Sequence, residues 1–219
     1  MFSGLPATEN LHLFRNSIEF LEKLESFDIV QFGHFEYKGK AMDGSRLHGE
    51  IFVDFRRLTT GQELEISEYY RAAIMEWFSE KENLLIAGVA MGSLALPKLI
   101  QLSLYADMGA EYIYTEKRDG ALGIYDQQAE KCRGKHILFI EDACNNGASS
   151  RELIREITEK KEVLGITGFS ILYGVHRGHT FFHEPKGEFY AMSSLYAPAY
   201  HASECPACEK GIPLKQYKK

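Results

Sequence analysis

Four apolar residues, 137–140, are followed directly by two carboxylates, Glu141 and Asp142. Small residues including Gly147 come next, and helical periodicity begins at about Ser150. A continuous apolar run predicts a strand buried on both faces, with the acids at its carboxyl end. N–H groups of a glycine-containing loop and a helix N-terminus can hold phosphate, while carboxylates can hold sugar hydroxyls. The segment therefore predicts a site for a phosphorylated sugar, and two solvated strand-end carboxylates are the alternative.

Strands of the same kind alternate with helices along the chain. Apolar runs predict further strands at residues 84–89, 111–115 and 168–175, with amphipathic helices between them. Apolar strands that alternate with helices indicate a parallel sheet covered on both faces. Right-handed crossovers place the loops after these strands at one edge of that sheet. The expected fold class is α/β, with a Rossmann-like parallel-sheet core.

The segments before and after this core have a different character. Thr8 is the predicted N-cap of a first helix, and Ser67 is the predicted N-cap of a second one. Between them, glycines punctuate the short aromatic and apolar pieces of residues 30–58, which predicts a small antiparallel hood. We expect a single domain over residues 1–219, with hood elements at about 1–60 and 196–219 and a core at about 61–195.

Composition narrows the class of protein. The 219 residues are 45% hydrophobic and carry a formal net charge of -6. A general nucleic-acid binder usually has a basic surplus, so no nucleic-acid partner is expected. Residues 1–10 lack the basic and apolar parts of a signal peptide, and no apolar segment is long enough to span a bilayer. A cytoplasmic protein without a membrane partner is expected.

The segment from Ile137 to Ser149 resembles the phosphoribosyl-diphosphate (PRPP) signature of type I phosphoribosyltransferases. In that family the two acids hold the ribose 2- and 3-hydroxyls, which implies this role for Glu141 and Asp142. The family usually has Thr where this chain has Asn145 or Asn146. The resemblance implies that the ribose 5-phosphate loop is formed by Asn145, Asn146, Gly147, Ala148 and Ser149, and that Ala143 also contacts PRPP.

Two more segments resemble the family in the same order along the chain. Residues 88–92 resemble its diphosphate loop, which implies PRPP contacts for Ala90, Met91 and Gly92; a routine strand-to-helix turn is the alternative. Residues 114–120 resemble the segment after the third core strand of orotate phosphoribosyltransferases, where a Lys meets the diphosphate. Lys117 falls on that Lys, and an exposed charged loop is the alternative. Lys117, Glu141 and Asp142 are the expected catalytic residues.

Arg177 follows the predicted strand at 168–175. In orotate-type enzymes an Arg at this place meets the carboxylate of the base, and a guanidinium suits that planar group through two parallel hydrogen bonds. A hydrated turn that also contains His176 and His179 is the alternative. Residues 204–214 resemble the ending of a bacterial and archaeal subset of orotate phosphoribosyltransferases.

Cys205 and Cys208 form a C-x-x-C pair with three interpretations: a turn with free thiols, a zinc site or a redox pair. A structural zinc needs about four ligands. His201 is the candidate third ligand, and the candidates for the fourth are His183, Cys132 and Cys144.

The resemblance as a whole implies an enzyme that transfers ribose 5-phosphate from PRPP to a nitrogen base. Orotate is the expected base, and the products would be orotidine 5′-phosphate and diphosphate, in pyrimidine nucleotide synthesis. Mg²⁺ is the expected cofactor, and a homodimer is the expected assembly. The alternatives are a PRPP-binding sensor without transferase activity and a transferase for another base.

Overall fold

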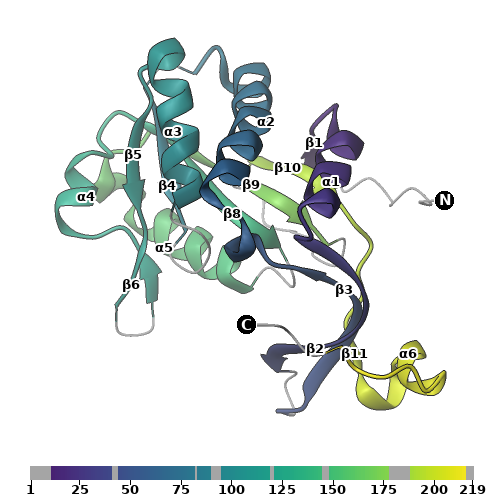
Figure 1. Ribbon diagram of the computed structural model, residues 1–219. Coiled ribbons are helices and arrows are strands. Elements are labelled where there is room, and N and C mark those ends of the chain that lie inside the picture. Colours follow the sequence, from purple (N-terminus) through teal and green to yellow (C-terminus); the bar gives the residue numbers. More distant parts are fainter. Residues whose placement is uncertain are drawn as a thin grey trace.

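The computed structural model describes residues 11–40, 44–81, 83–89, 95–118, 121–144, 148–177 and 188–215. A six-stranded sheet in the order β1-β10-β9-β8-β4-β5 forms its centre, and every neighbouring pair in it is parallel (Figure 1). The expected α/β class is thus confirmed. The strands are β1 (Leu11–Leu13), β4 (Leu84–Gly88), β5 (Glu111–Tyr114), β8 (His136–Cys144), β9 (Gly168–His176) and β10 (Glu188–Ser194).

Helices cover both faces of this sheet. One hydrophobic cluster joins it to α1 (Ser17–Ser26), α2 (Thr60–Phe78) and α3 (Ala95–Met108). A second cluster joins the opposite face to α5 (Ala148–Leu164), with α4 (Asp126–Glu130) beside it. None of the described helices combines the length and the apolar character needed to cross a lipid bilayer.

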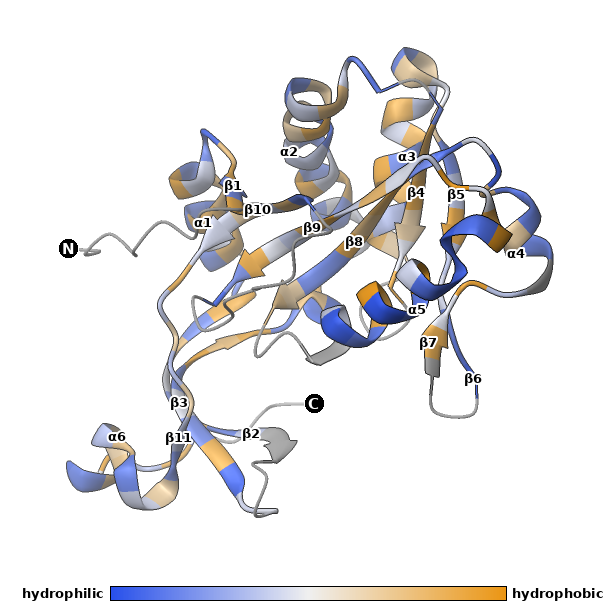
Figure 2. Cartoon of the chain, turned by 180° about the vertical axis from the view of Figure 1, so that it is seen from behind, coloured by the Kyte–Doolittle hydropathy of each residue, from blue (hydrophilic) through white to orange (hydrophobic). Residues whose placement is uncertain are grey.

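Strand β8 shows why a continuous apolar run suits this architecture. Leu138 and Ile140 belong to the cluster under α2 and α3, whereas Ile137 and Phe139 belong to the cluster under α5. Alternate side chains of a strand point to opposite faces, so a strand between two helical layers needs apolar residues at every position. Figure 2 shows long hydrophobic stretches in β4 and β8, and mostly hydrophilic residues along α5.

The structure corrects both predicted helix starts. Helix α2 begins at Thr60, because the Thr59 hydroxyl accepts from the Gln62 amide (3.4 Å) and Gln62 Oε1 accepts from the Thr59 amide (2.9 Å). Ser67 is therefore mid-helix, where its hydroxyl donates to Leu64 O (2.8 Å). Residues 11–13 form β1 against β10 rather than a helix, and Thr8 lies outside the described residues.

A second, antiparallel sheet forms the hood expected between residues 30 and 58. It contains β2 (Val30–Lys40), β3 (Arg46–Val53) and β11 (Tyr200–His201) in the order β11-β3-β2. It projects away from the main sheet, with α6 (Pro206–Glu209) beside it (Figure 1). A small hairpin of β6 (Glu116–Arg118) and β7 (Ala121–Gly123) extends beyond the main sheet near α5.

Candidate functional site

The order of the strands reverses at β4. The chain passes from β4 to β5 on one side and later returns to β8 on the other side. Ligands of open parallel sheets bind beyond the carboxyl ends of the strands at such a reversal. The Val89 amide donates to Ile140 O (3.3 Å), so the end of β4 is bonded to β8 at the residue before the acidic pair. The described start of the predicted diphosphate segment, residues 88 and 89, thus lies beside the strand that carries the predicted ribose-binding acids.

The two acids lie inside β8, because β9 keeps pairing with β8 as far as Cys144. Both side chains are half-buried. Burial raises the pKa of the Glu141 carboxyl to about 7, although Ser150 donates to its Oε2 (2.8 Å) and so favours the charged form. Burial also raises the pKa of Asp142. The Ala143 amide, which donates to Asp142 Oδ1 (2.7 Å), lowers this pKa but does not cancel the effect of burial. Partly desolvated carboxylates gain most from a bound cation or hydroxyl donor.

Gly174 on β9 allows close packing beneath Asp142. A Cβ there would lie 2.5 Å from Asp142 O, 2.6 Å from Phe55 Cζ and 2.6 Å from Tyr70 Oη. Phe55 belongs to the 3-10 turn Phe55–Arg57 (η1) that follows the hood strand β3, and its side chain is buried. The glycine therefore lets the junction between hood and core rest against the strand beside the acidic pair.

Arg56 is a basic residue of this site that sequence reasoning missed. Its Nε donates to Asp54 Oδ1 (2.6 Å), and the same oxygen accepts from the Arg56 amide (3.3 Å). This contact with Asp54 is the main cause that raises the pKa of Arg56, and the charge of Asp142 adds to it. The signal available in the sequence was two arginines directly after a predicted strand, with Asp54 as a local cap.

Lys117 lies in β6 and is exposed. It pairs across the hairpin with Leu122 of β7, whose amide donates to Glu152 Oε1 (2.9 Å) on α5. The hairpin is thus attached to the helix that follows the acidic pair. Its contact with a diphosphate stays a prediction.

The predicted PRPP site lies partly within and partly outside the described residues. Ala148 and Ser149 form the start of α5, which begins two residues earlier than expected. Ala143 lies in β8 beside Asp142. Outside the described residues are Ala90, Met91, Gly92, Asn145, Asn146 and Gly147.

Arg177 is buried, with 6% of its surface exposed, so the hydrated-turn interpretation is wrong. Its guanidinium lies over the Tyr37 ring, 4.6 Å from the centroid, and Nη2 donates to Tyr37 Oη. The same nitrogen donates to Ile51 O (3.3 Å) and Ala197 O (3.2 Å). Arg177 therefore connects the end of β9 to the hood, and its contact with a base stays a prediction.

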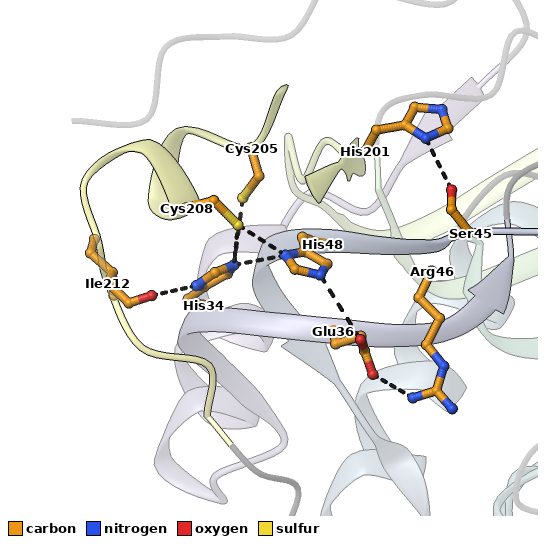
Figure 3. Close-up of polar contacts among 9 residues, drawn as sticks. All are labelled: His34, Glu36, Ser45, Arg46, His48, His201, Cys205, Cys208 and Ile212. Carbon is orange, nitrogen blue, oxygen red and sulfur yellow. Dashed lines mark hydrogen bonds and ion pairs between the residues drawn. The ribbon is translucent and has the colours of Figure 1, made fainter. Parts of the chain in front are cut away.

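The cysteine pair meets different partners from those expected. His34 and His48 of the hood lie beside Cys205 and Cys208, whereas His201 points to Ser45 Oγ (3.1 Å) (Figure 3). The choice of His201 as third ligand is therefore corrected. The other ligand candidates do not join the cluster either: Cys132 and Cys144 lie in the core, and His183 is outside the described residues.

No protein-family model and no curated protein matches the sequence. Solved structures do match the fold. UMP synthase of Leishmania donovani is 24% identical with a TM-score of 0.57, over 82% of this chain and 36% of that one. Orotate phosphoribosyltransferase of Aeropyrum pernix is 18% identical with a TM-score of 0.58, and the match covers 80% of this chain and 92% of that chain. Adenine phosphoribosyltransferase of Leishmania donovani is 10% identical with a TM-score of 0.55, and the match covers 87% of this chain and 86% of that chain.

This chain spans about a third of the length of the UMP synthase. The proteins that share its architecture act, by their names, on different bases. The six-stranded parallel sheet, its flanking helices and these likenesses together show that the chain has the fold of the type I phosphoribosyltransferases.

Proposed function

We propose that this protein transfers ribose 5-phosphate from PRPP to a nitrogen base, and that the base is orotate. The observation that carries the proposal is the half-buried pair Glu141 and Asp142 at the reversal point of the sheet. The pair has the chemistry needed to accept hydrogen bonds from two neighbouring ribose hydroxyls. A twofold dimer and a place in pyrimidine nucleotide synthesis belong to the same proposal.

The reaction needs charge stabilisation and positioning rather than a nucleophilic side chain. As diphosphate leaves, positive charge develops on the ribose ring and negative charge on the leaving group. Glu141 and Asp142 orient the ribose and place negative charge near the ring, while Lys117 stabilises the leaving diphosphate. Arg56, close enough to Asp142 to influence its pKa, adds positive charge at the same edge.

The donor set also fits a divalent cation. Mg²⁺ prefers one or two carboxylates together with phosphate oxygens and water. Asp142 and Glu141 are such carboxylates, and burial leaves both in need of a positive partner. When bound, the ion would neutralise charge on the departing diphosphate. The remaining oxygen ligands would come from PRPP itself.

The choice of orotate is supported by Arg177 and by the tail. Arg177 is the buried cation at the carboxyl end of β9, and a carboxylated base would pair with a guanidinium. The resemblance of residues 204–214 to the ending of some orotate phosphoribosyltransferases points the same way, as does the likeness to the Aeropyrum pernix enzyme.

A panel of bases with PRPP and Mg²⁺, read as diphosphate release, tests the proposal. We expect release with orotate, and a loss of about 100-fold or more in Asp142→Asn. Asp107→Asn is the matched control, because Asp107 accepts from Arg71 on the surface of the core and should leave the rate unchanged. Release only with adenine or hypoxanthine would overturn the choice of base.

A PRPP-binding regulator without transferase activity is the second candidate. Asn145 and Asn146 stand where the family usually has Thr, and this departure in the phosphate loop favours it. Calorimetric binding of PRPP with Mg²⁺, in the absence of turnover with any base, would select this candidate over the enzyme.

A further inference from the structure

Four potential metal ligands from three separate segments converge in the hood. His34 lies on β2, His48 on β3, Cys205 at the N-cap of α6 and Cys208 within α6. Their ligand atoms all lie within 4.8 Å of one another. His34 Nε2 is 3.1 Å from His48 Nδ1, 3.5 Å from Cys208 Sγ and 3.6 Å from Cys205 Sγ, and His48 Nδ1 is 3.2 Å from Cys208 Sγ (Figure 3).

Each imidazole has an acceptor oxygen on the side of its ring that faces away from the cluster. His34 Nδ1 is 2.6 Å from Ile212 O, and a carbonyl only accepts, so Nδ1 is the donor and a neutral ring offers the lone pair of Nε2 to the cluster. His48 Nε2 faces Glu36 Oε2 at 4.0 Å, which favours the proton on Nε2 and a lone pair on Nδ1. Histidine ligands of metals usually have such a carbonyl or carboxylate behind the ring.

We propose that His34, His48, Cys205 and Cys208 bind a structural zinc ion. His34 Nε2 and His48 Nδ1 lie 3.1 Å apart, near the separation of two nitrogens that bind one cation. Tetrahedral zinc with two sulfur and two nitrogen ligands separates neighbouring ligand atoms by roughly 3.3–3.8 Å, close to the spacing of this cluster. Thiolate and imidazole together select zinc over oxygen-seeking magnesium or calcium.

The site has the closed character of a structural centre. Four protein ligands complete the tetrahedral shell and leave no position for a substrate. His34, His48 and Cys205 are buried, and Cys208 is half-buried. The four-residue helix α6 and the two-residue strand β11 offer little packing of their own. The ion would therefore attach the C-terminal segment to the β2–β3 hairpin, which goes beyond the proposed transferase activity.

The primary experiment measures metal in the full chain, expressed without a histidine tag and kept reduced. We expect about one zinc per chain by mass spectrometry of the metal. Replacement by Co²⁺ should give the thiolate charge-transfer band and the d–d bands of tetrahedral cobalt. Cys208→Ser and His48→Asn should each lower zinc affinity at least about tenfold, while His201→Ala, next to the cluster but turned to Ser45, should keep full zinc.

Three results would overturn the proposal: less than about a tenth of a zinc per chain, iron in place of zinc, or a Cys205–Cys208 disulfide in freshly prepared protein. The cobalt spectrum of the unmodified chain decides the matter if a ligand variant fails to fold. None of these measurements uses PRPP or a base, so their outcome is separate from that of the proposed transfer reaction.

Discussion

At the scale of single residues, the acidic pair shows a conflict between stability and binding. Glu141 is held where its charge is disfavoured, since burial raises its pKa from 4.5 to about 7. A buried carboxyl group destabilises the folded protein when it ionises, and a bound cation or hydroxyl donor offsets this loss of stability.

The first prediction concerns the pH dependence of this cost. The pKa of Glu141 is 4.5 in the unfolded chain and about 7 in the folded chain. Between pH 4.5 and pH 7 the folded protein therefore binds more protons than the unfolded chain, so its stability falls as the pH rises through this range. Glu141→Gln should therefore be more stable than the parent chain at pH 8, by about 1–3 kcal/mol, and equally stable near pH 4. Urea unfolding over this range measures the difference.

Glu159→Gln is the control, because Glu159 is exposed on α5 and should change stability little at any pH. A parallel pH profile for Glu141→Gln and the parent chain would show that Glu141 ionises normally in the folded protein.

The second prediction concerns Gly174. An alanine methyl there would meet Asp142 O, Phe55 and Tyr70 at 2.5–2.6 Å, so Gly174→Ala should destabilise the protein by about 1–3 kcal/mol. Gly61→Ala, in the first turn of α2 with open space around it, should be neutral or slightly stabilising. Equal urea midpoints for the two variants would contradict the close packing beneath Asp142.

At the scale of elements, two segments project from the core: the hood and the β6–β7 hairpin. Arg177 fastens the hood to β9 through Tyr37 and Ile51. The hairpin carries Lys117 on three-residue strands and is held through Glu152. Mutation of the hood attachment should therefore change the free energy of unfolding, whereas mutation of Lys117 on the hairpin should change the reaction rate.

For the hood, a double-mutant cycle between Arg177→Lys and Tyr37→Phe tests the attachment. The buried guanidinium stacks on the ring and donates to its hydroxyl, so the two changes should be coupled by about 1 kcal/mol or more in unfolding free energy. The exposed pair Arg71 and Asp107 should show a smaller coupling. Additive effects of the Arg177 and Tyr37 changes would contradict a connection between β9 and the hood.

For the hairpin, Lys117→Ala should lower kcat by about 10- to 100-fold while the melting temperature stays unchanged. The side chain is exposed and supports no packing, so only the stabilisation of the leaving diphosphate is lost. Lys131→Ala, also exposed, serves as the control. A normal rate in Lys117→Ala would make Lys117 an ordinary surface residue.

The accuracy of sequence reasoning also differed between elements. Core strands were predictable because burial on both faces demands unbroken apolar runs, as in β4 and β8. Strands β1 and β10 were not predicted, and the N-cap of α2 is Thr59 rather than the predicted Ser67, because Thr59 and Gln62 form the capping box. The partners of Cys205 were unpredictable, because His34 lies 171 residues earlier and only tertiary structure brings them together.

At the scale of the whole molecule, the two sheets should differ in stability. The main sheet lies between two apolar clusters, whereas the hood rests on few core contacts and on the proposed zinc site. Removal of zinc with a chelator should therefore speed hydrogen exchange in β2, β3 and residues 205–215, while β4 and β8 keep their protection. Uniform loss of protection across both sheets would show that the ion supports the entire fold.

The pairing of β1 with β10 has a consequence for synthesis on the ribosome. Leu11 stands opposite Phe189, so the first described strand of the nascent chain finds its neighbour only after the chain as far as β10 has emerged. Contacts so distant along the chain form late and slow folding. Until β10 has been made, the backbone N–H and C=O groups of β9 that pair with it stay unpaired, and this interval is when chaperones have most to protect.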